Sequence, residues 1–162
     1  MVNSKLRGMG GWLLFLCVVL TIISPLVAFT STLKEISDIE STNKALSSEA
    51  TWSDFKVALW MTVAIQQSIG FSAGYVLGIS LPSSIRYAIF AIWFSGPVMT
   101  LISVGTLGRI ADRAFDYDYS VALTTQLPGH IAFAVVWTLY LKVSKRVKNT
   151  CPSSEHLAQL AA

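Results

Sequence analysis

Four long windows without a charged residue dominate this sequence, and they cover 8–33, 57–85, 87–108 and 119–141. Each window is longer than the about 20 apolar residues that a helix needs to cross a hydrocarbon core about 30 Å thick. A soluble helix bundle would carry charges every few residues on its water-facing side. Charged residues make up only 13% of the chain, against about 25% in soluble domains. We therefore expect an all-α, four-helix transmembrane bundle.

The expected helices lie at 12–29, 57–80, 87–107 and 121–141 within a single membrane domain that covers 1–150. The remaining residues, 151–162, are polar and then rich in Leu and Ala, which predicts a disordered cytoplasmic tail. In the first long connection, Leu33, Ile36 and Ile39 recur about once per helical turn. This spacing predicts a short amphipathic helix that lies on the outer surface.

Basic residues near the helix ends predict the orientation, because they stay preferentially on the cytoplasmic side. With four spans, both termini share one side. That side is basic and carries almost no acid, whereas the connection 30–56 holds five acidic residues against three lysines. We therefore expect both termini in the cytoplasm (N-in/C-in) and the two longer connections outside.

Three glycines in the second expected helix, Gly70, Gly74 and Gly78, repeat every four residues and therefore share one helix face. Without Cβ atoms, such a face lets another helix backbone approach closely, and close packing drives helix association in lipid. We interpret this face as a packing surface within the bundle or between protomers in a homo-oligomer. A flexible or pore-lining face is the alternative.

The most polar intramembrane positions are Gln66, Gln67 and His130. Buried amides are unfavourable unless they are hydrogen-bonded, and neighbouring glutamines point about 100° apart on a helix. At least one glutamine should therefore face the bundle interior. These three residues predict either interhelical hydrogen bonds or the lining of a path for a solute or ion.

Other chemistry has little basis in the sequence. No Asp, Glu, Lys or Arg lies inside an expected span, which argues against a charge relay. The sequence has no second His or Cys at ligand spacing beside His130, no nucleophile with an evident base, no phosphate-binding loop and no nucleic-acid module. We therefore expect no enzyme activity, no metal and no cofactor. Pro25, Pro97 and Pro128 predict kinks in three of the helices.

Two terminal motifs resemble those of a known family. The motif GGWLLF begins at Gly10, and the motif YLKVSKRVKNT begins at Tyr140. The chain resembles the YdgK-like bacterial inner-membrane family, which is catalogued as a domain of unknown function, although Cys151 stands where the family has an aromatic residue. The resemblance covers about residues 8–151. It implies a bacterial cytoplasmic membrane and the same topology, and it implies no activity.

Both motifs suit the cytoplasmic interface of the membrane. Trp12 fits the headgroup level, and the basic residues after the last helix fit anionic lipid or a protein partner; they are Lys142, Lys145, Arg146 and Lys148. From the sequence we expect a small non-enzymatic membrane protein that binds or stabilises a membrane partner or assembly. The first alternative is a transporter or channel subunit that uses Gln66, Gln67 and His130. The second is an immunity or stress protein that protects the inner membrane.

Overall fold

The computed structural model describes residues 10–42, 50–80, 83–115 and 121–150, and every element in these ranges is helical. The all-α prediction is confirmed. The helices form four long rods and one short terminal helix: α1 (Trp12–Val18), η2 (Val19–Ile23) and α2 (Ser24–Thr42); α3 (Ala50–Gly78); α4 (Ser84–Trp93), η4 (Phe94–Val98) and α5 (Met99–Phe115); α6 (Val121–Thr125) and α7 (Leu127–Val143); and α8 (Lys145–Thr150).

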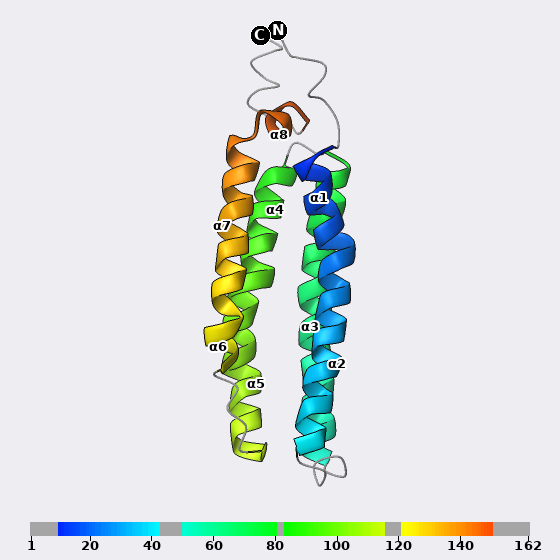
Figure 1. Ribbon diagram of the computed structural model, residues 1–162, viewed down its shortest axis with the longest axis vertical. Coiled ribbons are helices and arrows are strands. Elements are labelled where there is room, and N and C mark those ends of the chain that lie inside the picture. Colours follow the sequence, from blue (N-terminus) through cyan, green and yellow to red (C-terminus); the bar gives the residue numbers. More distant parts are fainter. Residues whose placement is uncertain (1–9, 43–49, 81–82, 116–120, 151–162) are drawn as a thin grey trace.

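The rods lie side by side in two pairs (Figure 1). The first pair joins the α1–η2–α2 rod with α3, and the second pair joins the α4–η4–α5 rod with the α6–α7 rod. Helix α3 also packs against α4 and α5, so it connects the two pairs. The first rod begins and the last rod ends at one end of the bundle, which we call the α8 end (Figure 1). We call the opposite end, where α2 ends and α3 begins, the α2–α3 end.

The prediction of a separate surface helix at residues 33–39 is wrong, although the segment is helical. The first rod continues from Trp12 through Thr42 rather than ending at residue 29. Ile39 is buried, and it packs in a cluster with Trp52 and Phe55 from the start of α3. The apolar repeat thus forms a packing face of one long helix, because α3 lies alongside it.

Other helix boundaries also lie beyond those expected. Helix α3 begins at Ala50 rather than residue 57, and the third rod extends from Ser84 to Phe115 rather than from 87 to 107. The 29 residues of α3 give a length of about 44 Å at 1.5 Å per residue. This is longer than a hydrocarbon core of about 30 Å. The charge-free windows predict where a helix could cross a hydrocarbon core, whereas the helices continue past these windows into segments that carry charged residues.

Two apolar clusters hold the bundle together at different levels. The larger cluster lies toward the α8 end and includes Leu13, Leu16, Leu77, Ile92 and Trp137, all nearly or fully buried. The smaller cluster lies toward the α2–α3 end and consists of residues from α2, α3 and α5, namely Ile39, Trp52, Phe55, Leu59, Leu107 and Ala111. Between these two levels the interior contains both polar and apolar side chains.

Each proline coincides with an irregularity in its rod. The π-helical segment η2 ends two residues before Pro25, and η4 contains Pro97. Pro128 lies in the first turn of α7, directly after the break at Gln126 that separates α6 from α7. Proline lacks an N–H and crowds the preceding turn, so local widening of the helix relieves both effects.

The outside of the bundle is apolar on every rod. Large side chains with more than half of their surface exposed include Leu26, Met61, Phe90 and Val136, one on each rod. Two rods, 12–41 and 84–111, are long and apolar enough to cross a membrane by length and composition. Soluble proteins rarely expose apolar surface so widely, so this belt is suited to contact with lipid.

Candidate functional site

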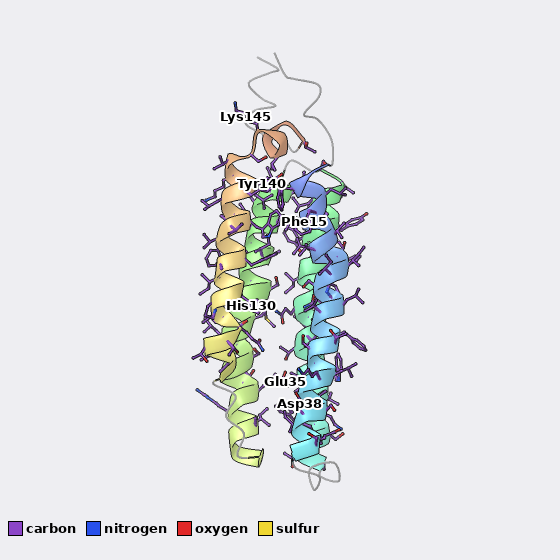
Figure 2. All side chains as sticks on the ribbon, in the orientation of Figure 1. Phe15, Glu35, Asp38, His130, Tyr140 and Lys145 are labelled. Atoms are coloured by element: carbon purple, nitrogen blue, oxygen red, sulfur yellow. The ribbon has the colours of Figure 1, made fainter. Side chains whose placement is uncertain are left out.

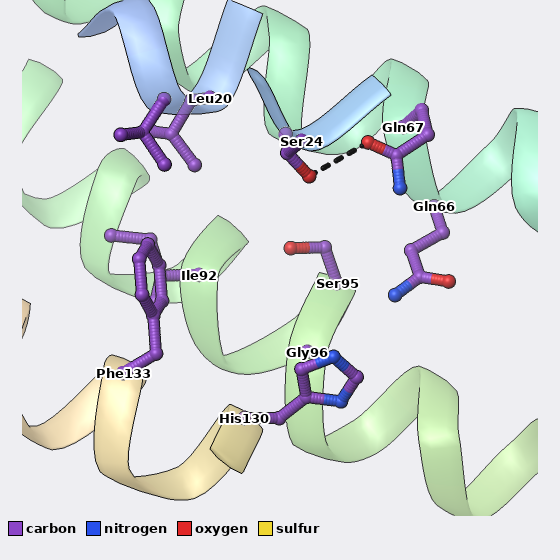
Figure 3. A pocket seen from close by; sticks show the side chains of 11 residues that line it. Leu20, Ser24, Gln66, Gln67, Ile92, Ser95, Gly96, His130 and Phe133 are labelled. Atoms are coloured by element: carbon purple, nitrogen blue, oxygen red, sulfur yellow. Dashed lines mark hydrogen bonds between the residues drawn. The ribbon is translucent and has the colours of Figure 1, made fainter. Parts of the chain in front are cut away.

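The three polar residues singled out in the sequence lie together in the structure. Gln66 and Gln67 extend from α3, and His130 extends from α7 across the interior. Figure 3 shows Gln66, Ser95 and His130 directed toward a common space beside the Ser24–Gln67 pair. This space is a cavity of about 160 Å³. The two helix pairs therefore bring polar groups from four rods to one level of the bundle.

A second and larger cavity, of about 490 Å³, shares Ser24, Gln66, Gln67 and His130 with the first. We call the two together the polar chamber. The larger cavity is lined by Ser24, Val27, Ala28, Ser31, Thr32, Glu35, Leu59, Thr62, Val63, Gln66, Gln67, Ser103, Leu107, Thr125, Gln126, Gly129 and His130. Its volume falls within the about 300–1,000 Å³ of typical small-molecule sites.

One glutamine is tied to the neighbouring rod. The Ser24 hydroxyl donates a hydrogen bond of 2.9 Å to the Gln67 side-chain carbonyl oxygen (Figure 3). This bond fixes the amide orientation of Gln67, because its oxygen must face Ser24. Gln66 forms no hydrogen bond with any side chain that the structure describes, and its amide is half-buried in the chamber wall. Gln66 is therefore available to a guest molecule or water.

His130 is oriented by Thr100. The Thr100 hydroxyl lies 2.7 Å from Nδ1 of His130 and donates to the Gly96 carbonyl oxygen at 2.9 Å. A hydroxyl has one proton, so Nδ1 is assigned from this network as the protonated nitrogen. The imidazole Nε2 is then left as an acceptor. Thr100 is buried and His130 half-buried, so the pair is a fixed part of the chamber wall.

Glu35 is the charged residue of the chamber lining. It lies on α2 between the level of His130 and that of Asp38 (Figure 2). Its side chain is half-buried, and no other described side chain forms an ion pair or hydrogen bond with it. Among the residues that line the chamber there is no Lys or Arg. The chamber lining thus has a negative charge at one level.

The glycine face packs inside the chain. A Cβ atom on Gly74 would lie 2.6 Å from Thr21 Cγ2, 3.2 Å from Leu20 Cβ and 3.4 Å from the Cys17 carbonyl oxygen. Gly70 is buried beside Leu20 and borders the chamber, whereas Gly78 is exposed at the end of α3. Two of the three glycines are therefore covered by the first rod.

The residues predicted at the interface gather at the α8 end. Trp12 is 65% exposed, and its ring lies 5.6 Å from that of Phe15 and 6.4 Å from that of Trp137. Gly11 precedes it with a φ of 58°, a conformation that favours glycine and explains part of the first motif. Trp12 thus presents an aromatic surface at one rim of the apolar belt.

The second motif bends the chain at Ser144. Its backbone is extended, and its hydroxyl accepts a hydrogen bond of 3.5 Å from the Val147 N–H, as an N-cap of α8 does. Val147 is fully buried in the larger apolar cluster, so α8 is held against the end of the bundle. Lys142 and Lys145 are exposed there. The side chains of Arg146 and Lys148, and the residues from Cys151 onward, lie outside the part described.

A polar cluster fastens the α2–α3 end. The Trp52 indole and the Lys56 ammonium donate hydrogen bonds of 2.8 Å and 2.9 Å to Glu40, and Lys56 also lies 5.6 Å from the Trp52 ring centroid. Glu40 lies 28 residues after Trp12, where the first rod begins, and a helix needs only about 20 residues to cross a hydrocarbon core. The two hydrogen bonds, from Trp52 first and then from Lys56, hold the pKa of the Glu40 carboxyl below its ordinary value. The cluster thus stabilises the contact between α2 and α3.

Within the described ranges, no group of three or more His, Cys, Asp or Glu side chains is arranged to hold a metal ion. His130 instead bonds to Thr100.

The sequence analysis missed much of the chamber lining. Ser24, Ser31 and Glu35 lie at intervals of seven and four residues, which places them on one face of a helix. Thr62, Gln66 and Gly70 form a similar face on α3. This signal was available in the sequence, but it becomes visible only when the first helix is extended past residue 29 to include Glu35.

The fold and lining together define a small helical protein with an apolar exterior, two buried apolar clusters and a partly polar chamber between them. A family model described as Protein of unknown function (DUF2569) matches residues 6–151, and the chain belongs to that family. The expectation of an uncharacterised family is therefore confirmed, and the narrower YdgK-like assignment stays a prediction. No curated protein and no solved structure is significantly similar to this chain.

Proposed function

We propose that the chain is a non-enzymatic protein of the bacterial cytoplasmic membrane that binds a small polar solute in the polar chamber, as a transporter subunit does. In this proposal all four rods span the bilayer and both termini lie in the cytoplasm. The observation that carries it is the convergence of Gln66, Gln67 and His130 on one cavity of about 490 Å³. Of the functions considered from the sequence, this geometry favours the one that uses these residues.

The apolar belt supports placement in the bilayer, because exposed large apolar side chains occur on all four rods. The exposed Lys142 and Lys145 at the α8 end support cytoplasmic termini, since basic residues favour that side and anionic lipid. Sites within membrane proteins commonly lie near the bilayer midplane, where irregular helices line a cavity. The η2 and η4 segments and the Gln126 break lie beside the chamber in this way.

The shape of the interior favours solute binding over an open channel. Toward the α8 end the chamber consists of the smaller cavity, of about 160 Å³, whose wall includes Leu20 and Ile92. Both residues belong to the larger apolar cluster, which continues from there with buried residues such as Leu16. A solute would therefore occupy the chamber without a continuous polar path, and release at the other side would require a second conformation.

The partner-binding function expected from the sequence has less support. Its main basis was the glycine face, and Gly74 packs against Cys17, Leu20 and Thr21 of the same chain. A protein partner would then have to bind at the α8 end, where Trp12 and two of the basic residues are exposed.

A binding experiment tests the proposal with two acyclic hydroxylated solutes, sorbitol and its primary-amine analogue glucamine. Purified protein in lipid nanodiscs is dialysed to equilibrium against each solute, and the bound amount is measured by mass spectrometry. We expect saturable binding of at least one solute and about tenfold weaker binding in Gln66→Leu, because an apolar group leaves the solute's polar groups unpaired. Ser68→Leu, on the exposed face of α3, is the matched control and should bind normally. Absence of saturable binding for both solutes would refute the proposal.

A further inference from the structure

We propose that Glu35 makes the polar chamber selective for a small organic cation, one that carries an ammonium group together with hydroxyl or amide groups. This inference rests on the proposed function, and it names the class of solute that the same site would take. It depends on three features of the lining: its charge, its hydrogen-bonding groups and the arrangement of its side chains.

Charge is the first feature. Glu35 is half-buried in the lining, and the part of the wall that the structure describes contributes no Lys or Arg to oppose it. The one ion pair formed by described side chains, Lys56 with Glu40, lies outside the chamber lining. A carboxylate in a partly desolvated, low-dielectric wall attracts a cation and repels an anion more strongly than it does in water.

The hydrogen-bonding groups are the second feature. The wall offers acceptors in the Glu35 carboxylate, the Gln66 side-chain carbonyl and the Nε2 atom of His130, together with the hydroxyls of Ser31 and Thr62. An ammonium group has three donors and no acceptor, so it is complementary to this surface. The Thr62 hydroxyl donates to the Ala58 carbonyl oxygen at 2.8 Å, so it accepts from a solute. The Ser31 hydroxyl can donate or accept, which suits a solute that also carries hydroxyl groups.

The arrangement of the side chains is the third feature, and it separates an organic cation from a bare metal ion. Protein oxygens that coordinate Ca²⁺ lie about 2.3–2.6 Å from the ion on several sides. Within the described residues, no group of three or more His, Cys, Asp or Glu side chains is arranged in that way, and Glu35 is the one carboxylate in the lining. The larger cavity has no Phe, Tyr or Trp in its lining, and the smaller one has only Phe133. One aromatic ring does not form the aromatic cage that recognises quaternary ammonium groups. A protonated primary or secondary amine remains as the matching chemistry.

The test compares three acyclic six-carbon solutes that differ mainly in charge: glucamine as the cation, sorbitol as the neutral solute and gluconate as the anion. Their affinities for the protein in nanodiscs are measured by equilibrium dialysis at neutral pH. In the wild-type chain we expect glucamine to bind about tenfold more tightly than sorbitol, and gluconate to bind most weakly. Glu35→Gln should bring glucamine and sorbitol to equal affinity. Asp38→Asn removes an exposed acid of the same helix that is outside the lining, and it should keep the preference.

The outcomes separate this inference from the proposed function. Equal binding of glucamine and sorbitol by the wild-type chain would overturn the cation selectivity and leave solute binding intact. The same holds if the preference for glucamine persists in Glu35→Gln. Retained sorbitol binding shows that the Glu35→Gln chamber is folded, and if that variant does not fold, the wild-type comparison alone decides. Absence of saturable binding for all three solutes would overturn the proposed function itself.

Discussion

A single methyl group at Gly74 should weaken the contact between α3 and the first rod. The added Cβ would lie 2.6 Å from Thr21 Cγ2, closer than such atoms approach in proteins, and 3.2 Å from Leu20 Cβ. The Thr21 methyl cannot easily turn away, because the Thr21 hydroxyl donates a hydrogen bond of 2.7 Å to the Cys17 carbonyl oxygen. Overpacking of this kind costs about 1–3 kcal/mol, whereas Ala in place of Gly favours a helix by about 1 kcal/mol.

Gly74→Ala should therefore lower the free energy of unfolding by about 0–2 kcal/mol. Gly105→Ala is the matched control, since a Cβ there meets no atom within 4 Å, and it should raise stability by up to about 1 kcal/mol. The two variants should thus differ by about 1–3 kcal/mol. Unfolding is followed by tryptophan fluorescence during a reversible SDS titration in bicelles.

A second substitution identifies the atom responsible. Thr21→Ser deletes the clashing Cγ2 methyl and keeps the hydroxyl that bonds to the Cys17 carbonyl. Combined with Gly74→Ala, it should recover much of the lost stability, so the double-mutant cycle should show favourable coupling. If Gly74→Ala is as stable as Gly105→Ala, or if Thr21→Ser gives no recovery, the packing described here is incorrect.

Three further predictions address hydrogen bonding, pH and orientation. Ser24→Ala and Gln67→Leu should couple by only about 0.6 kcal/mol, the average for interhelical hydrogen bonds in a membrane, and a double-mutant cycle in bicelles measures this. The lowered pKa of Glu40 adds stability that is complete above the ordinary value of 4.5 and is lost as pH falls through the folded-state value. Thermal midpoints below pH 4.5 should therefore fall less steeply in Glu40→Gln than in the wild-type chain, and equal slopes would contradict the assignment. In spheroplasts, an impermeant maleimide should label Ser41→Cys and leave Lys145→Cys unlabelled, and the reverse pattern would invert the proposed topology.

Much of the fold follows from the sequence, because charge is excluded from lipid over long stretches. The four charge-free windows coincide with the four rods in the described ranges. The ends of the helices could not be predicted from the windows. Lys34 and Lys56 each border a charge-free window, yet both lie inside a helix. Glu40 and Trp52 show why: contacts between two helices stabilise turns that lie outside the charge-free windows.

Three polar residues of the chamber could be predicted from the sequence, but their hydrogen-bond partners could not. Gln66, Gln67 and His130 stood out because polar groups are rare in lipid, and the chamber contains all three. Their partners are less conspicuous, because Ser24 and Thr100 are ordinary residues in a membrane helix. Which hydroxyl bonds to which polar side chain depends on how the rods pack against one another. The spacing of residues along one helix does not give distances to residues on another helix.

The central claim is that a hydrophilic chamber exists within the membrane-embedded bundle, and thiol accessibility tests it most directly. Thr62→Cys places a thiol on the chamber wall. Met61→Cys, at the same depth on α3, places one on the outside of the bundle, where Met61 is 60% exposed. Each is made in a Cys151→Ser background that retains the buried Cys17, and proteoliposomes are treated with a small hydrophilic methanethiosulfonate. The account predicts rapid modification of Thr62→Cys and little of Met61→Cys. Equal reactivity at the two positions, or protection of Thr62→Cys alone, would contradict it.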